Sequence, residues 1–547
     1  MDHLFHSSPN RPPALAFALA LAFALGLIAR LFQIDLQIPM DDEWHALAKA
    51  ASAPYGAIVL SFGLADHSIP VALAYRWLIG QGWLSEGAMF AGPFVAGLVA
   101  CVGLVLAVRR AVTPLALSLF AGLLALSPLL VLYARQARPY SIALCLALAA
   151  AWGAWRWWHA GKARHALLCV ACGPLAVWFL PLVAPFVLGV WPVLLVKWLA
   201  APRHERRGFA GLSAIGTVSV LLTAALIGPP FLNDLDVIRA KASQDFPDLH
   251  TLVRTAARFA GTASALPALA MGLACIPGVV LLARARPEAT RFFVALLALQ
   301  VATVLATRAY LLHYPIVFAR YLLVLLPFLL LAAAVGLAWV LSPLGRIARP
   351  LPLLAGWAAL AALVVLGPLP ESMRYPNSFF GHHREFFEFD RTENPVDAVL
   401  GEGPVPAFYA TLGREDPATR TVIEAPWRYE SIFNRLPYFQ RVHRQRVKIG
   451  LVGGLCPPGA TTEQMRAFPN RFRQFVDLAM PAERLRLEAD YVVFHRTLEL
   501  RNLEGNWLYP GGLPLPPVAG CIERFAALFG PPVFEDRAIT VFSLAPR

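Results

Sequence analysis

Residues 13–32 read PALAFALALAFALGLIARLF, an apolar run that is long enough to cross a bilayer as a helix, which takes about 20 residues. The run lacks a small-residue cleavage site and is longer than the apolar core of a signal peptide, so we interpret it as a retained first span. Similar runs recur up to residue 367. A chain with 58% hydrophobic and 15% charged residues and a mean hydropathy of +0.58 is too apolar for a soluble protein.

The apolar runs predict a membrane all-α bundle of about 11 transmembrane helices, followed by a C-terminal α/β domain. We expect two domains: residues 1–369, with an external loop at 33–87, and a soluble accessory domain at 370–547. The predicted spans lie near residues 13–32, 88–107, 112–132, 141–158, 166–180, 182–199, 209–229, 262–283, 291–307, 320–342 and 351–367.

The loops between these spans sort by charge. Basic residues gather in alternate loops, for example at Arg109 and Arg110, at Arg284 and Arg286, and at Arg346. Short basic loops stay in the cytoplasm, so the N-terminus is expected inside, and the loop 33–87 and the C-terminal domain outside the cytoplasmic (inner) membrane of a bacterium. The net charge of +13 therefore belongs to topology and membrane lipids, and nothing resembles a nucleic-acid-binding module.

An acidic cluster follows the first span directly. Residues 39–50 read PMDDEWHALAKA and place Asp41, Asp42 and Glu43 at the start of a short amphipathic helix. Carboxylates suit a helix N-terminus, so a solvated helix start at the membrane surface is one interpretation. A catalytic carboxylate is the other. Farther along the loop, residues 69–84 predict a helix that lies on the membrane surface.

Three arginines break the charge pattern of the loops. Arg135 and Arg138 lie between two predicted spans on the outer side, and Arg320 lies where the tenth span begins. An arginine near a membrane boundary can simply extend its head group to water. Three at one rim, on the side of the acidic cluster, favour a phosphate site, because guanidinium groups bind phosphate bidentately. A carboxylate beside such a site can take the proton of an acceptor hydroxyl while the cations stabilise a leaving phosphate.

These features resemble the GT-C membrane glycosyltransferases, especially the bacterial branch near protein O-mannosyltransferases and the lipid A aminoarabinose transferase. The matching features are the retained span, the external Asp42-Glu43, the outer Arg138-Pro139-Tyr140, and the run from Phe318 to Pro327. The resemblance implies transfer of a sugar, usually with inversion, from a polyprenyl-phosphate donor to a lipid, glycan or protein acceptor outside the membrane. It also implies Asp42 as general base with Asp41 as the rival, Glu43 as a neighbour, and Arg138 as the phosphate ligand with Arg135 or Arg320 assisting.

The substrate-binding candidates are less defined. Relatives of the aminoarabinose transferase carry a Lys-Pro-Pro-Leu-like stretch after the acidic loop, where this chain has His67-Ser68-Ile69-Pro70. His67 is a candidate for contact with phosphate or acceptor, and a solvated surface histidine is the alternative. Tyr140 and Tyr321 are candidates for substrate binding. His313, with Tyr310 and Tyr314 in the last external turn of the membrane half, is a candidate for the sugar pocket, and an interfacial aromatic belt is the alternative. No metal ligands are assigned, although a divalent metal is possible because some relatives use one.

The C-terminal domain shows no catalytic pattern. Strands are expected at 421–423, 447–452, 491–494 and 539–544, and helices near 463–488 and 520–529. Glu424 and His495 are interpreted as ordinary strand-end residues, and a disulfide between Cys456 and Cys521 is left open. The alternative function for the whole chain is a polytopic transporter or lipid flippase, which would be expected to carry ionisable residues near the bilayer midplane.

Overall fold

The computed structural model describes residues 13–545 apart from 40–42, 44–46, 48–49, 51–52, 64–67, 202–207, 240–245, 263, 310, 375–404, 427–435, 453–454, 456–471 and 497–517. Two compact units are present. The first comprises residues 1–32, 53–74 and 90–370, and the second comprises 33–52, 75–89 and 371–547. The second unit thus includes parts of the loop that the sequence analysis placed with the membrane domain.

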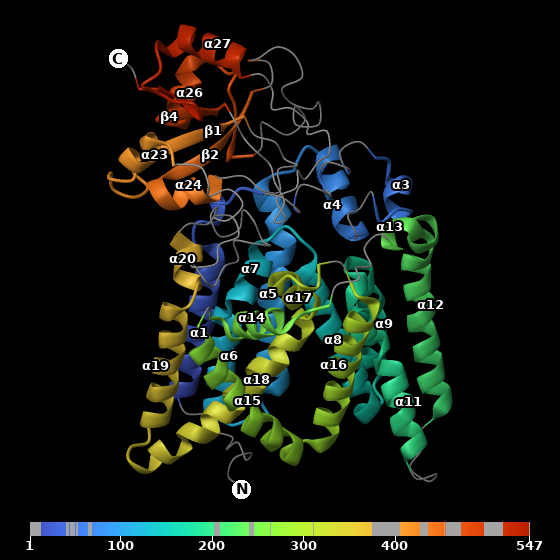
Figure 1. Cartoon of the computed structure of the whole chain (residues 1–547). Helices are drawn as coiled ribbons and strands as arrows, with labels where there is room; N and C mark the ends of the chain where they lie inside the picture. Colours follow the sequence, from blue (N-terminus) through green and yellow to red (C-terminus); the bar gives the residue numbers. More distant parts are fainter. Residues whose placement is uncertain are drawn as a thin grey trace. The chain divides into compact units, whose positions relative to one another are not determined.

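The first unit is a bundle of helices (Figure 1). Its long helices are α1 (Pro13–Leu31), α5 (Glu86–Val108), α6 (Pro114–Leu126), α8 (Tyr140–Ala160), α9 (Ala163–Phe179), α11 (Val190–Ala200), α12 (Phe209–Asn233), α14 (Leu249–Ala260), α15 (Ala265–Ala285), α16 (Pro287–Thr307), α18 (Leu326–Leu341) and α19 (Leu351–Leu366). Shorter helices are α3 (Tyr55–Val59), α7 (Pro128–Arg135), η3 (Pro181–Val183), α10 (Ala184–Leu188), α13 (Leu235–Arg239), α17 (Pro315–Tyr321), η5 (Leu323–Leu325) and η6 (Ser342–Arg346). The helices α4 (Ile69–Gly80), α5 and α20 (Leu369–Arg374) contain residues of both units.

Seven helical segments of the described chain are long and apolar enough to cross a membrane: Pro13–Leu36, Glu86–Val108, Pro181–Ala200, Phe209–Asn233, Ala265–Ala285, Pro287–Thr307 and Leu323–Arg346. An eighth results if α6 and α7 count as one bent span. The other three predicted spans correspond to α8, α9 and α19. Of these, α9 and α19 are shorter apolar helices, and α8 ends in a segment with Arg156 and His159. The prediction of a multi-pass helical membrane protein is confirmed, with fewer full-length spans than eleven.

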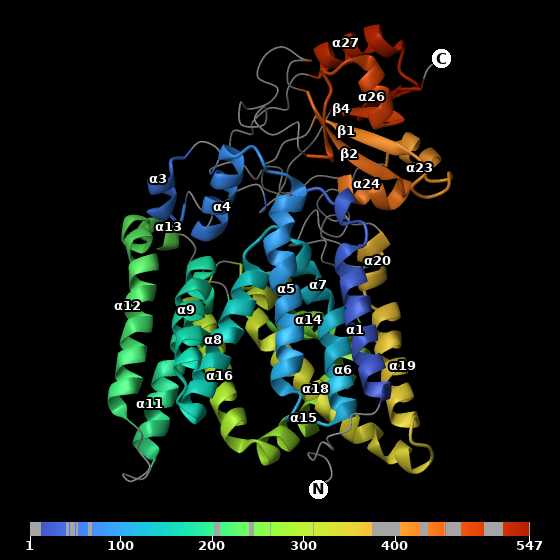
Figure 2. The same ribbon diagram turned by 180° about the vertical axis from the view of Figure 1, so that it is seen from behind.

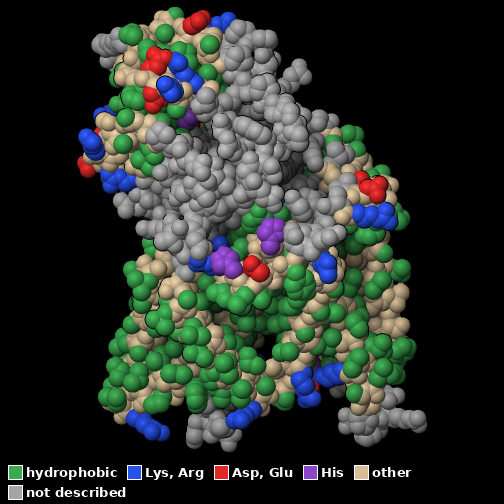
Figure 3. All heavy atoms as spheres, viewed as in Figure 1, with side chains coloured by type: hydrophobic (Ala, Val, Ile, Leu, Met, Phe, Trp, Pro, Cys, Tyr) green, Lys and Arg blue, Asp and Glu red, His purple; other side chains and the backbone are tan. Residues whose placement is uncertain are grey.

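Side-chain chemistry agrees with a membrane environment. Hydrophobic side chains cover the visible face of the helices, and Lys and Arg gather at the end where α15 turns into α16 and α18 into α19 (Figure 3). Large apolar side chains such as Leu221, Leu266 and Val340 are exposed in the isolated chain, as expected for residues that contact lipid.

Small residues let the helices approach closely. A Cβ atom added at Gly278 in α15 would lie 1.8 Å from the carbonyl oxygen of Ala332, and one added at Gly336 in α18 would lie 1.8 Å from that of Ala274. Ala274 and Gly278 are four residues apart on one helix, as are Ala332 and Gly336 on the other. This small-residue spacing is the one that membrane helices use for close backbone packing.

The predicted span 112–132 is broken. The helices α6 and α7 meet at Ser127 with a bend of 45°. Pro128 begins α7, and because proline has no backbone N–H and its ring clashes with the preceding turn, it ends the first helix. The bend redirects α7, which ends at Arg135, just before the Arg138-Pro139-Tyr140 corner.

In the second unit, η2 (Ile34–Leu36) precedes the acidic stretch, and the C-terminal part is an α/β domain. Its elements are α23 (Ala407–Leu412), β1 (Thr421–Ala425), α24 (Leu436–His443), β2 (Arg446–Leu451), β3 (Phe475–Asp477), α26 (Ala482–Glu488), β4 (Tyr491–His495), α27 (Ala519–Phe529), β5 (Phe534–Glu535) and β6 (Ile539–Ser543). The sheet order is β3-β2-β1-β4-β6-β5, with β3, β2, β1 and β4 parallel and β6 antiparallel to both β4 and β5.

The predicted α/β class of this domain is confirmed, and so are its four predicted strands. Of the helix expected near 463–488, the described residues show only the end, α26 (Ala482–Glu488), because β3 occupies Phe475–Asp477. The pairing of β3 with β2 supplies hydrogen bonds that outweigh a weak helical pattern over so few residues. Gln474, next to β3, donates from its backbone N–H to Glu86 Oε1 at 3.0 Å, which ties the stretch 75–89 to this unit.

Cys521, in α27, is disulfide-bonded. Cys101, Cys145, Cys169, Cys172 and Cys275 of the helical unit are free thiols. The open question of a Cys456–Cys521 pair lies outside the described residues, because Cys456 is not among them.

Candidate functional site: an arginine pair at Tyr140

The corner between α7 and α8 carries the first arginine. The backbone N–H of Arg138 donates to the carbonyl of Gln136 at 2.8 Å, which closes a tight turn. Pro139 then precedes α8, and Tyr140 is the first residue of that helix. The Tyr140 ring packs edge-to-face on Tyr133 of α7, with centroids 4.9 Å apart. The corner is thereby fixed at both ends, and Arg138 and Tyr140 are both buried.

The second arginine lies on α17, which α14 holds in place (Figure 1). The hydroxyl of Thr251 donates to the carbonyl of His313 at 2.7 Å, and that of Thr255 donates to the carbonyl of Pro315 at 3.1 Å. Asp248 caps α14 by accepting from the backbone N–H of Thr251 at 2.7 Å, and this bond holds the pKa of its carboxyl below the usual value. One turn of α14 therefore sets where α17 begins.

A buried glutamine holds the other end of α17. The side chain of Gln300 in α16 donates to the carbonyls of Leu182 at 2.9 Å and Tyr321 at 3.2 Å, and it accepts from the backbone N–H of Phe186 at 3.2 Å. Gln300 has no exposed surface, so these bonds form in a low-dielectric interior where losing them is costly. The sequence analysis did not single out Gln300, Thr251 or Thr255.

These contacts place the guanidinium groups of Arg138 and Arg320 near one aromatic ring, that of Tyr140. The Cζ atom of Arg138 lies 5.9 Å and that of Arg320 lies 5.3 Å from the Tyr140 ring centroid. Arg320 also lies 5.7 Å from the ring of Tyr321. Arg138 is 8% exposed and Arg320 is 7% exposed. Attraction to the ring's π face holds each cation, and the pair offers planar donors that fit phosphate oxygens.

Arg135 lies in a different arrangement. Its Nη1 donates to the carbonyls of Ala29 at 3.2 Å and Phe32 at 2.8 Å, at the C-terminal end of α1. Carbonyls at the C-terminal end of a helix lack the donors of a following turn, and Arg135 supplies donors at the end of the first span. Among the three predicted arginines, the structure therefore brings Arg138 and Arg320 to one ring and directs Arg135 toward α1.

Arg30 is a further buried arginine that the sequence analysis did not single out. It donates from Nη1 to the carbonyls of Gly26 at 2.9 Å and Ala125 at 2.7 Å, and from Nη2 to Cys101 Sγ at 3.6 Å. These contacts join α1 to α5 and α6, which lie beside it (Figure 2). The role of Arg30 is to hold the bundle together at the end of α1.

Two residues of the predicted acidic cluster, Asp41 and Asp42, lie outside the described residues. His67, farther along the same loop, lies outside them as well. Glu43 is described: it is helical and 1% exposed. Leu47 and Ala50 are buried at spacings of four and seven residues from it, which fits one face of the expected short helix.

His313, another predicted site residue, packs its ring on Tyr314 with centroids 4.2 Å apart. Within the described ranges, no three His, Cys, Asp or Glu side chains gather in a metal-binding group.

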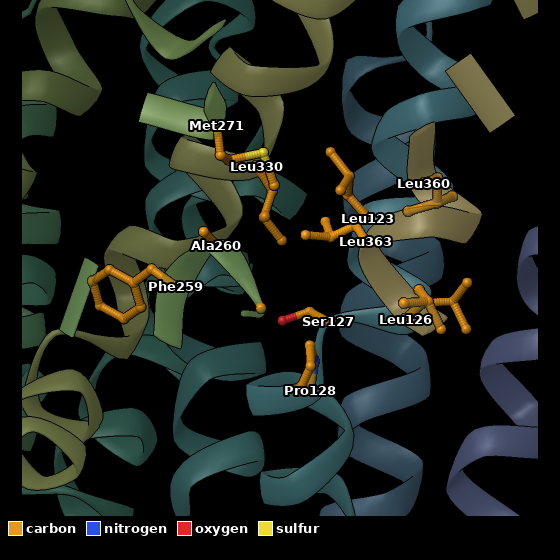
Figure 4. Close-up of a pocket in the computed structure, with 12 residues that line it drawn as sticks. Leu123, Leu126, Ser127, Pro128, Phe259, Ala260, Met271, Leu330, Leu360 and Leu363 are labelled. Carbon is orange, nitrogen blue, oxygen red and sulfur yellow. The ribbon is translucent and has the colours of Figure 1, made fainter. Parts of the chain in front are cut away.

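A small apolar pocket lies at the bend between α6 and α7 (Figure 4). Leucines of α6, α18 and α19 line it together with Phe259 and Ala260 of α14. The hydroxyl of Ser127 faces into it and has no hydrogen-bond partner among the described residues.

Together, the fold and the site define a multi-pass membrane protein with a buried cationic site in the helical unit and a separate α/β domain. The solved structures to which the chain is similar include GT-C enzymes, the class that the sequence resembles. ArnT from Cupriavidus metallidurans bound to undecaprenyl phosphate matches with 12% identity over 97% of this chain and 98% of that chain, at a TM-score of 0.44. The archaeal oligosaccharyltransferase AglB from Archaeoglobus fulgidus, in complex with an inhibitory peptide and a dolichol-phosphate, matches with 13% identity over 88% of this chain and 69% of that chain, at a TM-score of 0.42.

No protein-family model and no curated protein sequence matches the chain.

Proposed function

We propose that the chain is an integral membrane glycosyltransferase that moves a sugar from a polyprenyl-phosphate donor to an extracytoplasmic lipid, glycan or protein acceptor. The observation that carries the proposal is the convergence of Arg138 and Arg320 on Tyr140. A phosphate between the two guanidinium groups would accept hydrogen bonds from both and add a counter-charge to the site. Guanidinium groups keep their charge when buried, so the site suits a phosphate that gains charge as it leaves.

The chemistry requires one proton transfer and one bond exchange. Asp42 takes the proton of the acceptor hydroxyl, and the hydroxyl oxygen bonds to the anomeric carbon of the sugar. The bond from that carbon to the phosphate oxygen breaks, and the phosphate leaves with the electron pair. Arg138 and Arg320 stabilise its added charge, so no second carboxylic acid is needed to protonate the leaving group. Asp41 is the rival base, Glu43 its neighbour, and Arg135 a support of the bundle.

The lipid part of the donor has a candidate place. Pro128 lines the apolar pocket and begins α7, whose eight residues lead toward the Arg138 corner. At 1.5 Å per residue this helix is about 12 Å long, a distance that an isoprenoid chain of a few units spans. The apolar surface at this bend is therefore where hydrocarbon would lie next to a phosphate at the arginine pair.

Two observations support an extracytoplasmic α/β domain. The basic loops between α15 and α16 and between α18 and α19 have the composition of cytoplasmic loops. The disulfide at Cys521 belongs to the α/β unit, and disulfides persist in oxidising compartments such as the periplasm.

The test is sugar transfer from a synthetic polyprenyl-phosphate sugar by the purified protein in lipid nanodiscs. We expect turnover by the wild type, a strong loss in Arg138→Ala, and wild-type turnover in the control Arg286→Ala, whose side chain is exposed at a basic loop. No turnover with any polyprenyl-phosphate sugar, together with movement of such a lipid between leaflets of proteoliposomes, would instead support a flippase.

A further inference from the structure

The α/β domain contains a polar cluster at the point where its strand order reverses. From β1 the chain adds β2 and then β3 on one side, and it then returns to the other side of β1 to form β4. In open parallel sheets, ligands bind outside the carboxyl ends of the strands at this reversal. Glu424 lies near the carboxyl end of β1, and His495 is the last residue of β4.

Both side chains lie on one face of the sheet. Side chains alternate along a strand, so Glu424 shares a face with Val422, and His495 shares it with Val493. Val422 and Val493 pack in an apolar cluster with Tyr409 of α23 and Phe439 of α24. On this face of the sheet, β1 and β4 carry apolar side chains up to Val422 and Val493, and the polar Glu424 and His495 follow at the carboxyl ends of the two strands. They are buried, with 1% of Glu424 and 5% of His495 exposed.

Glu424 is the centre of the hydrogen bonds. The hydroxyl of Tyr409 donates to its two oxygens at 3.0 and 2.8 Å, and His495 Nε2 lies 2.5 Å from Oε2. A carboxylate can only accept, so the proton of this short contact belongs to the imidazole Nε2. The other ring nitrogen, Nδ1, is left for a second hydrogen bond. The structure gives Nδ1 no partner among the described residues.

Aromatic stacking fixes the ring planes. Phe439 stacks on Tyr409 with centroids 4.4 Å apart and on His495 with centroids 5.8 Å apart, at interplanar angles of 17° and 10°. His443 stacks on Tyr409 at 5.5 Å. Its Nε2 is buried without a hydrogen-bond partner in the described chain, and burial lowers the pKa of its imidazole to about 4. The cluster therefore contains one carboxylate, a neutral ring and oriented acceptors.

We infer that this reversal point is a second binding site, separate in its residues from the arginine pair, for a neutral hydroxyl-bearing ligand that forms a hydrogen bond with Nδ1 of His495. Glu424 and Tyr409 are positioning residues that hold the imidazole in one orientation. An anion would meet the charge of Glu424, so a neutral hydroxyl-bearing ligand is favoured over phosphate. An apolar pair would be cheaper to bury at these positions if the cluster served stability alone.

Chemical modification of the full chain in nanodiscs tests the inference. Diethyl pyrocarbonate acylates neutral imidazole at a nitrogen with a free lone pair, and peptide mass spectrometry gives a rate for each histidine. We expect modification of His495 and of the exposed reference His250, and none of His443, which has no exposed surface. Excess methyl glucoside should slow the reaction at His495 several-fold and leave His250 unchanged, and inorganic phosphate should change neither.

The Glu424→Gln variant tests whether Glu424 positions the imidazole of His495 for the ligand or only stabilises the fold. An amide in place of the carboxylate no longer fixes the orientation of the imidazole, so methyl glucoside should protect His495 several-fold less, while His250 keeps its rate and His443 stays unreactive. An unreactive His495 in the wild type, protection by phosphate and not by methyl glucoside, or undiminished protection of His495 in Glu424→Gln would each overturn the inference. Unfolding of the Glu424→Gln variant is recognised separately, because it would make the buried His443 reactive. In that case Tyr409→Phe, which keeps the aromatic ring and removes the hydroxyl, replaces Glu424→Gln as the test.

Discussion

Arg138 and Arg320 lie at the ring of Tyr140, although Arg138 precedes α8 and Arg320 belongs to α17. Separate parts of the bundle hold them: the bend at Pro128 sets the direction of α7 before the first, and α14 and Gln300 hold both ends of α17 for the second. A site built from rigid helices fits a reaction that depends on holding a phosphate at a fixed place.

The first prediction concerns the base. Asp42→Asn keeps the size of the side chain and removes its ability to take a proton, so kcat for sugar transfer should fall by about 100-fold or more while the KM for the donor stays close to the wild-type value. Asp41→Asn is the matched control and should change kcat little. Equal turnover by wild type and Asp42→Asn would remove Asp42 as the base.

A second prediction tests whether the hydrogen bond from Gln300 to Tyr321, at the C-terminal end of α17, supports donor binding. Gln300→Leu removes three hydrogen bonds and leaves the N–H of Phe186 and two carbonyls without that partner, which costs about 1–3 kcal/mol of stability. Because Tyr321 and Arg320 are adjacent, donor affinity should also fall. Thr303→Val on the exposed side of the same helix is the control, since its hydroxyl bonds only within α16. Donor affinity that is unchanged in Gln300→Leu would contradict this role.

The next prediction concerns the close contact between α15 and α18 at Gly278. Gly278→Leu places side-chain atoms where the backbone of Ala332 lies, so the protein should lose thermal stability and elute as aggregate from detergent. Gly272→Leu in the same helix is the control, because nothing lies within 4 Å of its added Cβ. Similar melting temperatures for the two variants would argue against the close crossing of α15 and α18.

The α/β domain should weaken in mild acid. Burial lowers the pKa of His443 from 6.5 to about 4, so between these values the unfolded state binds a proton that the folded state does not. Stability is therefore fully present above pH 6.5 and is lost as the pH falls toward 4, by up to about 3 kcal/mol. The nearby Glu424 charge opposes part of this shift.

Hydrogen exchange of the β1 and β2 peptides in the full chain measures this effect. Opening should be more frequent at pH 5 than at pH 7 after correction for the intrinsic exchange rate, and His443→Leu should reduce the difference. A pH dependence that is the same in wild type and His443→Leu would exclude His443 as its source.

Local patterns predicted much of the fold. Apolar runs with basic loops identified the membrane helices, and β-branched runs such as Thr421–Ala425 identified the strands, because both signals depend on neighbouring residues. The helix expected near 463–488 was right only at α26, because β3 is defined by its pairing with β2 and has little local signal of its own.

The candidate site was predictable only in part. Arg138 and Tyr140 are two residues apart and stood out as a motif, but the support from Gln300 and Thr251 exists only through contacts between distant helices. The same holds for Glu424 and His495, which looked like ordinary strand ends until the sheet order placed their strands side by side. Arg135 has the right residue type and position in the sequence, yet its hydrogen bonds go to the end of α1.

The most direct test of the central claim is a double-mutant cycle on donor binding. The dissociation constant of a polyprenyl phosphate is measured for wild type, Arg138→Ala, Arg320→Ala and the double variant in nanodiscs. If both arginines hold one phosphate, each single variant should lose about 2 kcal/mol, roughly 30-fold in affinity, and the double variant should differ from the sum by more than about 0.5 kcal/mol. Wild-type affinity in both single variants would contradict the account.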